Sequence, residues 1–258
     1  MVDETAVMVD ETDSLAAADQ ESSTCWICYD DESVGQLLRS GCACHGACGF
    51  VHLRCLVSAA DASAYREDDD FWVACPTCKE MRSGPTQLGL ARVRWGLVRS
   101  RPDWDHARQS ACTEMAVAHI EAGDFASAQK FREELLEVDR RMHGDEHPQT
   151  VSSLTNYGKI LSMRCEYGKA REIVESALRI VQESTLCQQL EAEARAQAAA
   201  ESDGKICPDG SLTAAIKMEL GSIDLELGDY DKAQQHFEEA VGGDVLAVPP
   251  PLAPLPML

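Results

Sequence analysis

The chain has 258 residues, enough for one large domain or two modest ones. Its 44 acidic residues outnumber its 23 basic residues and give a net charge of −21. This balance argues against nucleic acid as a partner, because phosphate binding requires Lys and Arg. No apolar run approaches the roughly 18–20 residues that cross a bilayer. We therefore expect a soluble chain with no membrane span and a cytoplasmic location, the nucleus remaining open.

Residues 1–24 contain seven acidic side chains and no Lys or Arg, and the tetrapeptide Val-Asp-Glu-Thr occurs twice, at 2–5 and 9–12. Such a segment buries too little apolar surface to offset the entropy of ordering. It also lacks the apolar core of a secretory signal. We expect a disordered acidic leader, and a compartment in which cysteines are thiols or metal ligands rather than disulfides.

The stretch that follows the leader contains four closely spaced pairs of metal-ligand residues. They are Cys25-x2-Cys28, Cys42-x-Cys44, His52-x2-Cys55 and Cys75-x2-Cys78. Zinc takes four such ligands in a tetrahedron, so eight ligands make two sites. A module of under about 60 residues buries too little apolar area to fold alone, and we predict that two Zn²⁺ ions supply the deficit. His45 and Cys48 lie in the same stretch and are interpreted as non-ligands, since the other eight residues fill the pattern.

Three details of this stretch resemble a RING-CH finger, the RING variant found in membrane-associated ubiquitin ligases. One residue separates Cys42 from Cys44, and seven residues separate Cys44 from His52. The run Phe-Val-His-Leu-Arg-Cys-Leu at 50–56 is very like the usual run of that family. A PHD finger, the alternative, has a wider second pair and fewer residues before the histidine. We assign residues 25–82 to a small zinc-stabilised α+β RING-CH domain.

The resemblance implies how the ligands pair and what the finger does. Cys25, Cys28, His52 and Cys55 would hold the first zinc. Cys42, Cys44, Cys75 and Cys78 would hold the second. The finger would dock a ubiquitin-conjugating enzyme charged with ubiquitin and act as a ubiquitin-protein transferase by positioning, with no catalytic nucleophile of its own. The positions that match the docking surface of the family are Ile27, Trp26, Trp72, Pro76 and Lys79.

Two other functions remain open at this stage. The finger could be a catalytically inactive scaffold, in which zinc only folds the module and the rest of the chain holds partners together. A PHD-like finger would instead bind a histone tail that contains lysine, and the short Cys42-x-Cys44 pair argues against it.

Residues 83–102 begin with Ser-Gly-Pro, which breaks the preceding structure. After the break, apolar side chains recur at helical spacing at Leu88, Ala91, Trp95 and Val98. We expect a linker helix that packs on the region after it, because a lone Trp on an exposed helix would be costly.

Residues 103–242 contain an internal repeat centred on three aromatic residues. Phe125 and Tyr167 are 42 residues apart, and Tyr230 follows after 63 residues, which is 42 plus an insertion of 21 residues near 187–210. Small residues occupy most of the positions that lie nine residues before and ten residues after each aromatic. The residues at these positions are Ala116, Gly158 and Gly221 before, and Leu135, Ala177 and Ala240 after. Small residues there would allow two helices to approach closely.

This pattern resembles tetratricopeptide repeats of the kinesin light chain kind, and the run Gly-Asp-Glu-His-Pro-Gln-Thr at 144–150 is similar to the loop between those repeats. The resemblance implies an all-α solenoid of about three helical hairpins that binds a protein or peptide. His147 would then be a loop residue and not a metal ligand. Residues 243–258 are rich in proline, and we expect an unstructured tail there.

Overall fold

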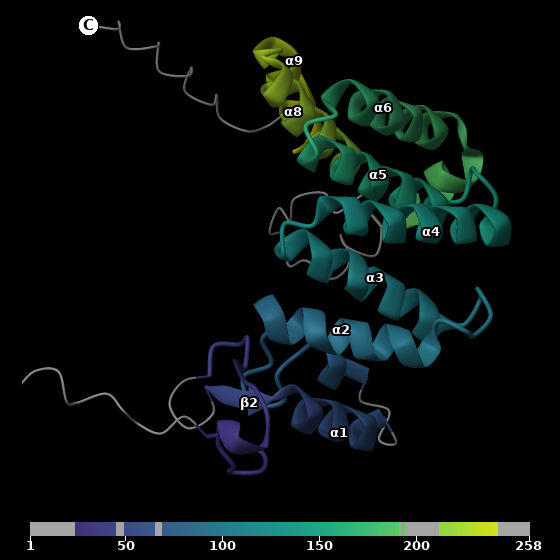
Figure 1. Ribbon diagram of the computed structural model, residues 1–258. Coiled ribbons are helices and arrows are strands. Elements are labelled where there is room, and N and C mark those ends of the chain that lie inside the picture. The colour runs from purple at the N-terminus through teal and green to yellow at the C-terminus, as the bar shows by residue number, and fades with distance from the viewer. Residues whose placement is uncertain (1–23, 45–48, 65–68, 191, 194–211, 242–258) are drawn as a thin grey trace, which may run out of the picture. The chain divides into compact units, whose positions relative to one another are not determined.

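The computed structural model describes residues 24–44, 49–64, 69–190, 192–193 and 212–241. The chain divides into two compact units, Met1–Arg94 and Trp95–Leu258, and each is described by itself. The first unit contains a two-stranded sheet with short helices, and the second is made of long helices (Figure 1). The predicted fold class, a small α+β domain followed by an all-α repeat array, is confirmed. The predicted leader (Thr24 apart), most of the insertion and the proline-rich tail lie outside the described residues.

The finger unit is built on one antiparallel strand pair. In chain order its elements are η1 (Glu32–Val34), β1 (Leu37–Arg39), β2 (Phe50–His52), α1 (Leu53–Ala64) and η3 (Asp69–Trp72). Each strand has three residues, and Leu37 pairs with His52 and Arg39 with Phe50. Strand β2 runs directly into α1, and this junction places His52 and Cys55 one helical turn apart.

The core of the finger unit is small and draws on a helix beyond the zinc-ligand region. Val51 of β2, Leu56 of α1 and Trp72 of η3 are buried together with Leu90. Leu90 belongs to α2 (Gly84–Val98), whose first turns lie in the finger unit. A Cβ on Gly89 would lie 2.8 Å from the Leu53 side chain, so the glycine permits this close packing. The compact unit therefore extends to Arg94, whereas the sequence places a linker from residue 83 onwards.

The last turn of α2 belongs to the second unit, where Trp95 contacts the first repeat. Its indole meets the Phe131 ring edge to face, with the ring centroids 5.5 Å apart. This geometry is a favourable aromatic arrangement and buries part of the Trp95 side chain. The expected contact between Trp95 and the first repeat is thus present.

The second unit contains three helical hairpins in its described residues. They are α3 (His106–Glu121) with α4 (Phe125–His143), α5 (Pro148–Met163) with α6 (Tyr167–Glu183), and α8 (Leu212–Leu227) with α9 (Tyr230–Ala240). The second helix of each hairpin begins at the aromatic residue that the sequence repeat marks, namely Phe125, Tyr167 and Tyr230. The predicted repeat array is confirmed.

Two glycines show why small residues recur nine positions before the aromatic. A Cβ added to Gly158 would lie 2.4 Å from the Val174 methyl, and one added to Gly221 would lie 2.6 Å from the Phe237 ring. Real Cβ atoms do not approach other atoms so closely, so each glycine allows its hairpin to close. In the first hairpin Ala116 is fully buried at the corresponding place.

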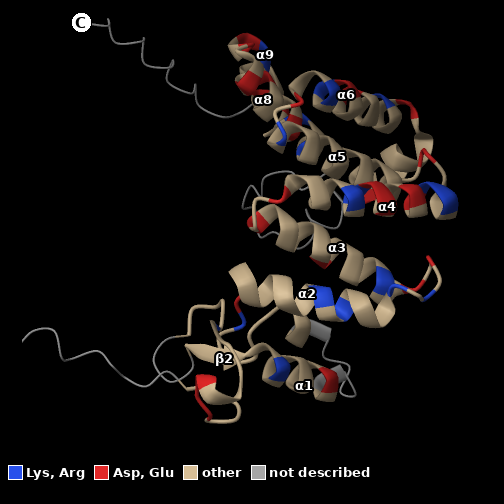
Figure 2. Cartoon of the chain, in the orientation of Figure 1, with Lys and Arg blue, Asp and Glu red and all other residues tan. Residues whose placement is uncertain are grey.

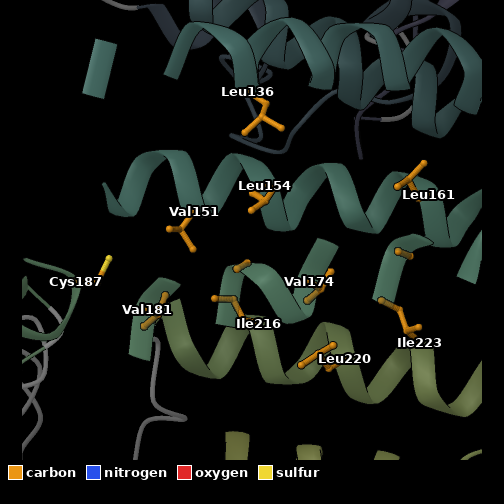
Figure 3. Close-up of a cluster of buried hydrophobic side chains, with 12 residues drawn as sticks. Leu136, Val151, Leu154, Leu161, Val174, Val181, Cys187, Ile216, Leu220 and Ile223 are labelled. Carbon is orange, nitrogen blue, oxygen red and sulfur yellow. The ribbon is translucent and has the colours of Figure 1, made fainter. Parts of the chain in front are cut away.

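Successive hairpins share one continuous core, drawn in Figure 3. Leu136 from α4, Leu154 from α5, Val174 from α6 and Leu220 from α8 all belong to it. In the close-up the labelled side chains project into the spaces between neighbouring helices. Each hairpin is therefore stabilised by the next one, as expected for a repeat protein. Among the residues that the structure describes, no helix is long and apolar enough to cross a membrane.

Candidate metal centre

Two cysteine pairs sit in turns of the same backbone shape. In the first turn the Tyr29 amide donates to the Cys25 carbonyl at 2.8 Å, and the Cys25 amide donates to the Asp30 carbonyl at 2.8 Å. Tyr29 has a φ of 64°, a left-handed conformation that is rare for a bulky residue. The turn holds the two thiols of Cys25 and Cys28 on one side of the chain.

The second turn repeats these features around the last cysteine pair. The Lys79 amide donates to the Cys75 carbonyl at 2.9 Å, and the Cys75 amide donates to the Glu80 carbonyl at 2.8 Å. Lys79 has a φ of 62°, matching Tyr29 in the first turn. A bridge between Ala74 and Met81 closes the base of the turn. The two pairs are thus equivalent ligand turns, each presenting two soft donors.

The structure brings eight cysteine and histidine side chains into two groups, and in each group the ligand atoms lie within 4.8 Å of one another. The groups are Cys25, Cys28, His52 and Cys55, and Cys42, Cys44, Cys75 and Cys78. They alternate along the chain, so the first ligand turn is completed by the β2–α1 junction and the second by residues 42–44. These are the same eight residues that the sequence pattern selects, grouped as the RING-CH resemblance implies. His45 and Cys48 lie outside the described residues.

His52 is oriented by a contact on the far side of its ring. Its Nε2 lies 3.0 Å from the carbonyl oxygen of Asp31, which can only accept, so Nε2 carries the proton and donates. The lone pair of Nδ1 then faces the sulfur atoms of Cys28 and Cys55, at 3.4 and 3.9 Å. A backbone carbonyl that fixes the tautomer of a ligating histidine is a common feature of metal sites. The Nδ1 lone pair is therefore available as the one nitrogen donor of the first group.

The first group favours one thiolate and resists a second. Burial raises the pKa of Cys25, but the amides of Cys28, His52 and Ile27 outweigh it and lower the pKa to about 6. The pKa of Cys28 is lowered by the Asp30 amide, yet burial and the thiols of Cys25 and Cys55 raise it to about 11. Neighbouring anions oppose each other unless a cation lies between them.

The second group has the same electrostatic pattern. Burial raises the pKa of Cys75, but the amides of Cys78 and Thr77 bring it down to about 6. The Cys78 side chain, together with burial and Cys75, raises the pKa of Cys44 to about 12. Cys44 and Cys75 sulfurs are only 3.9 Å apart. Four soft donors so close together fit a small dication such as zinc, which would neutralise the thiolates that otherwise repel.

The residues expected at the docking surface have different degrees of exposure. Pro76 and Lys79, on the second ligand turn, are exposed. Trp26 and Ile27, on the first, are half-buried and pack against the finger core. Trp72 is only 6% exposed and is part of that core, with the Arg94 guanidinium 5.9 Å from its ring centroid. Because little of its ring is accessible, we correct the assignment of Trp72 from docking to packing.

One supporting residue in the finger was not foreseen from the sequence. Arg82 is buried, its guanidinium lies 5.8 Å from the Phe71 ring, and its Nη1 donates to the Ser40 carbonyl at 3.2 Å. It thereby ties the segment after the last ligand pair to the segment before Cys42. Arg82 lies four residues after Cys78, and nothing in the sequence around it distinguishes a buried arginine from one on the surface.

Comparison with protein families identifies both parts of the chain. A RING-variant domain matches residues 25–78. Tetratricopeptide repeat models match residues 109–183 and 214–242. The chain thus combines a RING-variant domain, a zinc-binding type, with tetratricopeptide repeats, a class of protein-interaction module. The resemblances stated from the sequence are confirmed at the level of these domains.

Solved structures that the chain is similar to include BtubC (BKLC) from P. vanneervenii. It has 17% sequence identity and a TM-score of 0.42, and the match covers 73% of this chain and 76% of that chain. Two structures of nearly identical TPR-like repeats of kinesin light chain type, from Podosopora anserina, have 16% identity and TM-scores of 0.35 and 0.34. Each match covers 73% of this chain and 92% of that chain. Among curated proteins, none matches the chain.

Proposed function

We propose that this chain is a zinc-dependent ubiquitin-protein ligase of the RING type, with a protein substrate or adaptor bound by its repeats. The observation that carries the proposal is the alternating grouping of eight ligand residues within a stretch that matches the RING-variant domain. The alternative is a scaffold that has the same fold but no ligase activity. The experiment below distinguishes the ligase from the scaffold. The proposal includes a cytoplasmic location, with the nucleus as the alternative.

The finger would hold two Zn²⁺ ions, one in each ligand group. When bound, zinc supplies folding free energy and no chemistry of its own, because all four positions of each tetrahedron are filled by protein. His52, held by the Asp31 carbonyl, supplies the only nitrogen donor. The seven cysteines supply sulfur donors, and those with raised pKa values bind only after losing a proton.

The chain's own contribution to ubiquitin transfer would be positioning. Ile27, Trp26 and Pro76 offer apolar surface on the two ligand turns, and by resemblance a conjugating enzyme would dock there. Lys79 would donate hydrogen bonds from an ammonium that a left-handed backbone holds at the end of its turn. Holding a thioester and an acceptor lysine in reactive geometry lowers the entropic part of the barrier. The substrate bound by the repeats would provide the acceptor lysine.

A reconstituted ubiquitination assay tests the proposal with purified protein, a panel of conjugating enzymes and zinc analysis of the same sample. We expect two zinc ions per chain and ubiquitin chains whose formation falls at least tenfold in Ile27→Ala. Pro76→Ala and Lys79→Ala should each reduce it severalfold. Val34→Ala, a change to an exposed apolar residue of the finger outside the two ligand turns, should leave the rate unchanged. Cys25→Ser should lose zinc and activity together.

Other results would overturn parts of the proposal. Two zinc ions without activity on any conjugating enzyme would leave the chain as a scaffold. Equal activity in Ile27→Ala and the unaltered chain would mean that the docking residues are elsewhere. Fewer than two zinc ions would contradict the ligand assignment itself.

A further inference from the structure

The two ligand turns share an unusual backbone conformation directly after the second cysteine of each pair. Tyr29 follows Cys28 with a φ of 64°, and Lys79 follows Cys78 with a φ of 62°. Side chains rarely adopt this left-handed conformation, because the Cβ then crowds the following carbonyl oxygen. In the part of the chain that the structure describes, Cys165 is the only further residue other than glycine with a positive φ. The ligand turns therefore keep a tyrosine and a lysine where glycine would be free of strain.

The Tyr29 side chain does not contribute to the packing of the finger. It is 79% exposed, more than any other large apolar side chain of the described residues. The Tyr29 amide does hold the turn, by donating to the Cys25 carbonyl at 2.8 Å, but any residue except proline supplies that amide. Residues with a strained backbone cluster at binding sites and active sites, where function requires the side chain. The folding of the turn therefore does not account for a tyrosine at this position.

Tyr29 adjoins the expected docking residues in the chain. Ile27 comes two residues earlier in the same turn and is half-buried against the finger core. The three residues that follow Tyr29 are exposed acids, Asp30, Asp31 and Glu32, and Figure 2 shows acidic residues of the finger unit in red. Tyr29 thus lies between a partly buried apolar residue and a polar segment. Apolar residues bordered by a polar rim are the usual composition of a protein–protein interface.

The chemistry of tyrosine suits contact with a folded protein. Its ring offers a large contact area and has only two rotatable side-chain bonds, so little conformational entropy is lost when a partner fixes it. Tyrosine is enriched at binding hot spots, together with tryptophan and arginine. The hydrogen bonds of the ligand turn already hold the backbone of Tyr29, which lowers the entropy lost on binding further. The Tyr29 side chain is therefore suited to anchor a protein partner.

We propose that the Tyr29 ring is a further contact of the ubiquitin-conjugating enzyme on the first ligand turn. The two turns would then be used alike, because each presents one exposed side chain from a left-handed residue, Tyr29 in the first and Lys79 in the second. The inference rests on the proposed function, since the same partner has to dock on the finger. It assigns to Tyr29 a share of the docking affinity and no part in the transfer step.

The test measures docking and ubiquitin transfer separately on the zinc-loaded full chain. A panel of fluorescently labelled conjugating enzymes is titrated with the protein, and fluorescence anisotropy gives the affinity for each. For an enzyme that the unaltered chain binds, Tyr29→Ala should weaken binding at least fivefold. At saturating protein the rate of ubiquitin transfer should change less than twofold, because docking is altered and the reaction is not. Tyr29→Phe keeps the ring and should bind within about twofold of the unaltered chain.

Tyr29→Gly separates a binding role from a structural one. This change removes the ring and relieves the left-handed strain together, so the unfolding temperature should stay equal or rise while binding weakens as in Tyr29→Ala. A purely structural role predicts instead that weaker binding comes with a lower unfolding temperature or with loss of zinc. Val34→Ala, a change at an exposed apolar residue outside the ligand turns, should bind as before.

The possible failures distinguish the inference from the proposed function. Equal binding by Tyr29→Ala and the unaltered chain would overturn the inference and leave the proposed function intact. A loss in Tyr29→Phe or Val34→Ala as large as that in Tyr29→Ala would do the same, and so would loss of zinc in Tyr29→Gly. If the unaltered chain bound no conjugating enzyme of the panel, the proposed function and the inference would both be overturned.

Discussion

The finger and the repeats differ in what surrounds their buried side chains. The core cluster of the finger includes Cys25, one of the candidate metal ligands, together with residues of a single strand pair and Leu90 from α2. The repeat cluster runs through α4, α5, α6 and α8 and contains almost only aliphatic side chains. Beside this core the finger holds eight cysteine and histidine side chains in two groups that could each bind a metal ion.

This difference teaches that two adjoining parts of one chain can obtain stability from different sources. A small module can substitute metal–ligand bonds for apolar area, and structural zinc contributes about 10–16 kcal/mol in finger peptides. A repeat array instead adds one hairpin interface to the next. Removing the metal should therefore destabilise the finger and spare the repeats, and disrupting the packing between helices should do the reverse.

Chelation gives the largest expected effect and the sharpest test of this separation. A strong zinc chelator should unfold the finger, because thiolates brought together without a cation repel each other. The repeats should keep their helices. Two-dimensional NMR would report loss of dispersed finger signals, while far-ultraviolet circular dichroism would retain most of its helical intensity. Cooperative loss of both sets of signals would show that the repeats depend on the finger.

The second largest effect concerns a buried charge where the last two hairpins meet. Asp224 of α8 has a fully buried side chain; its carboxylate lies 2.6 Å from Arg171 Nη2 and 2.9 Å from His236 Nδ1. Asp224→Ala would remove the buried carboxylate shared by Arg171 and His236, while Asp229 would still contact Arg171 Nη2 at 3.2 Å. We therefore expect a loss of about 3 kcal/mol in unfolding free energy, the lower end for a broken buried ion pair. Denaturant titration followed by circular dichroism measures the loss.

A matched variant removes another partner of the same arginine at the surface. Glu175 lies 3.4 Å from Arg171 and has a side chain that is 54% exposed, so Glu175→Ala should cost at most about 1 kcal/mol. Zinc content should stay unchanged in both variants. Equal effects of the two changes would mean that burial does not set the strength of this network.

Much of the architecture could be predicted because its signals are local. Ligand spacing selects Cys25 and Cys28 as a pair, since both belong to one turn. The spacing of the repeated aromatic residues predicts where the second helix of each hairpin begins. Helices α4, α6 and α9 start at Phe125, Tyr167 and Tyr230, because the same turn geometry recurs. Both patterns depend on residues that are close in sequence, where backbone geometry allows few local structures.

Features that depend on distant residues could not be predicted. The burial of Trp72 could not be predicted, because its place three residues before Cys75 says nothing of the core formed by Val51, Leu56 and Leu90. Asp224 reads as an ordinary surface acid on an amphipathic helix, and only the fold brings Arg171 to it across 53 residues. Similarly, helical spacing alone could not divide α2 between two compact units.

A smaller effect tests hairpin closure in the repeats. Gly158→Ala would force a methyl to within 2.4 Å of Val174, and we expect a loss of about 1–3 kcal/mol in unfolding free energy from overpacking. Gly168→Ala, in a helix with open space around the Cβ, should instead gain about 0.5–1 kcal/mol. Adding Val174→Ala should recover part of the loss in Gly158→Ala. A loss of equal size at both glycines would contradict the close-approach argument.

The smallest effect concerns thiols of the repeats that lie far from the metal groups. Burial raises the pKa of Cys112 to about 12, so at pH 8 the thiol stays protonated and reacts slowly with iodoacetamide. Cys165 is exposed and should be alkylated before Cys112, as peptide mass spectrometry of briefly treated protein would show. Raising the pH to 10 should still leave Cys112 mostly unmodified, because that pH is below its raised pKa. Rapid labelling of Cys112 in zinc-loaded protein would mean that the first hairpin opens readily. Apolar packing would then stabilise the repeats less than we infer from their continuous core.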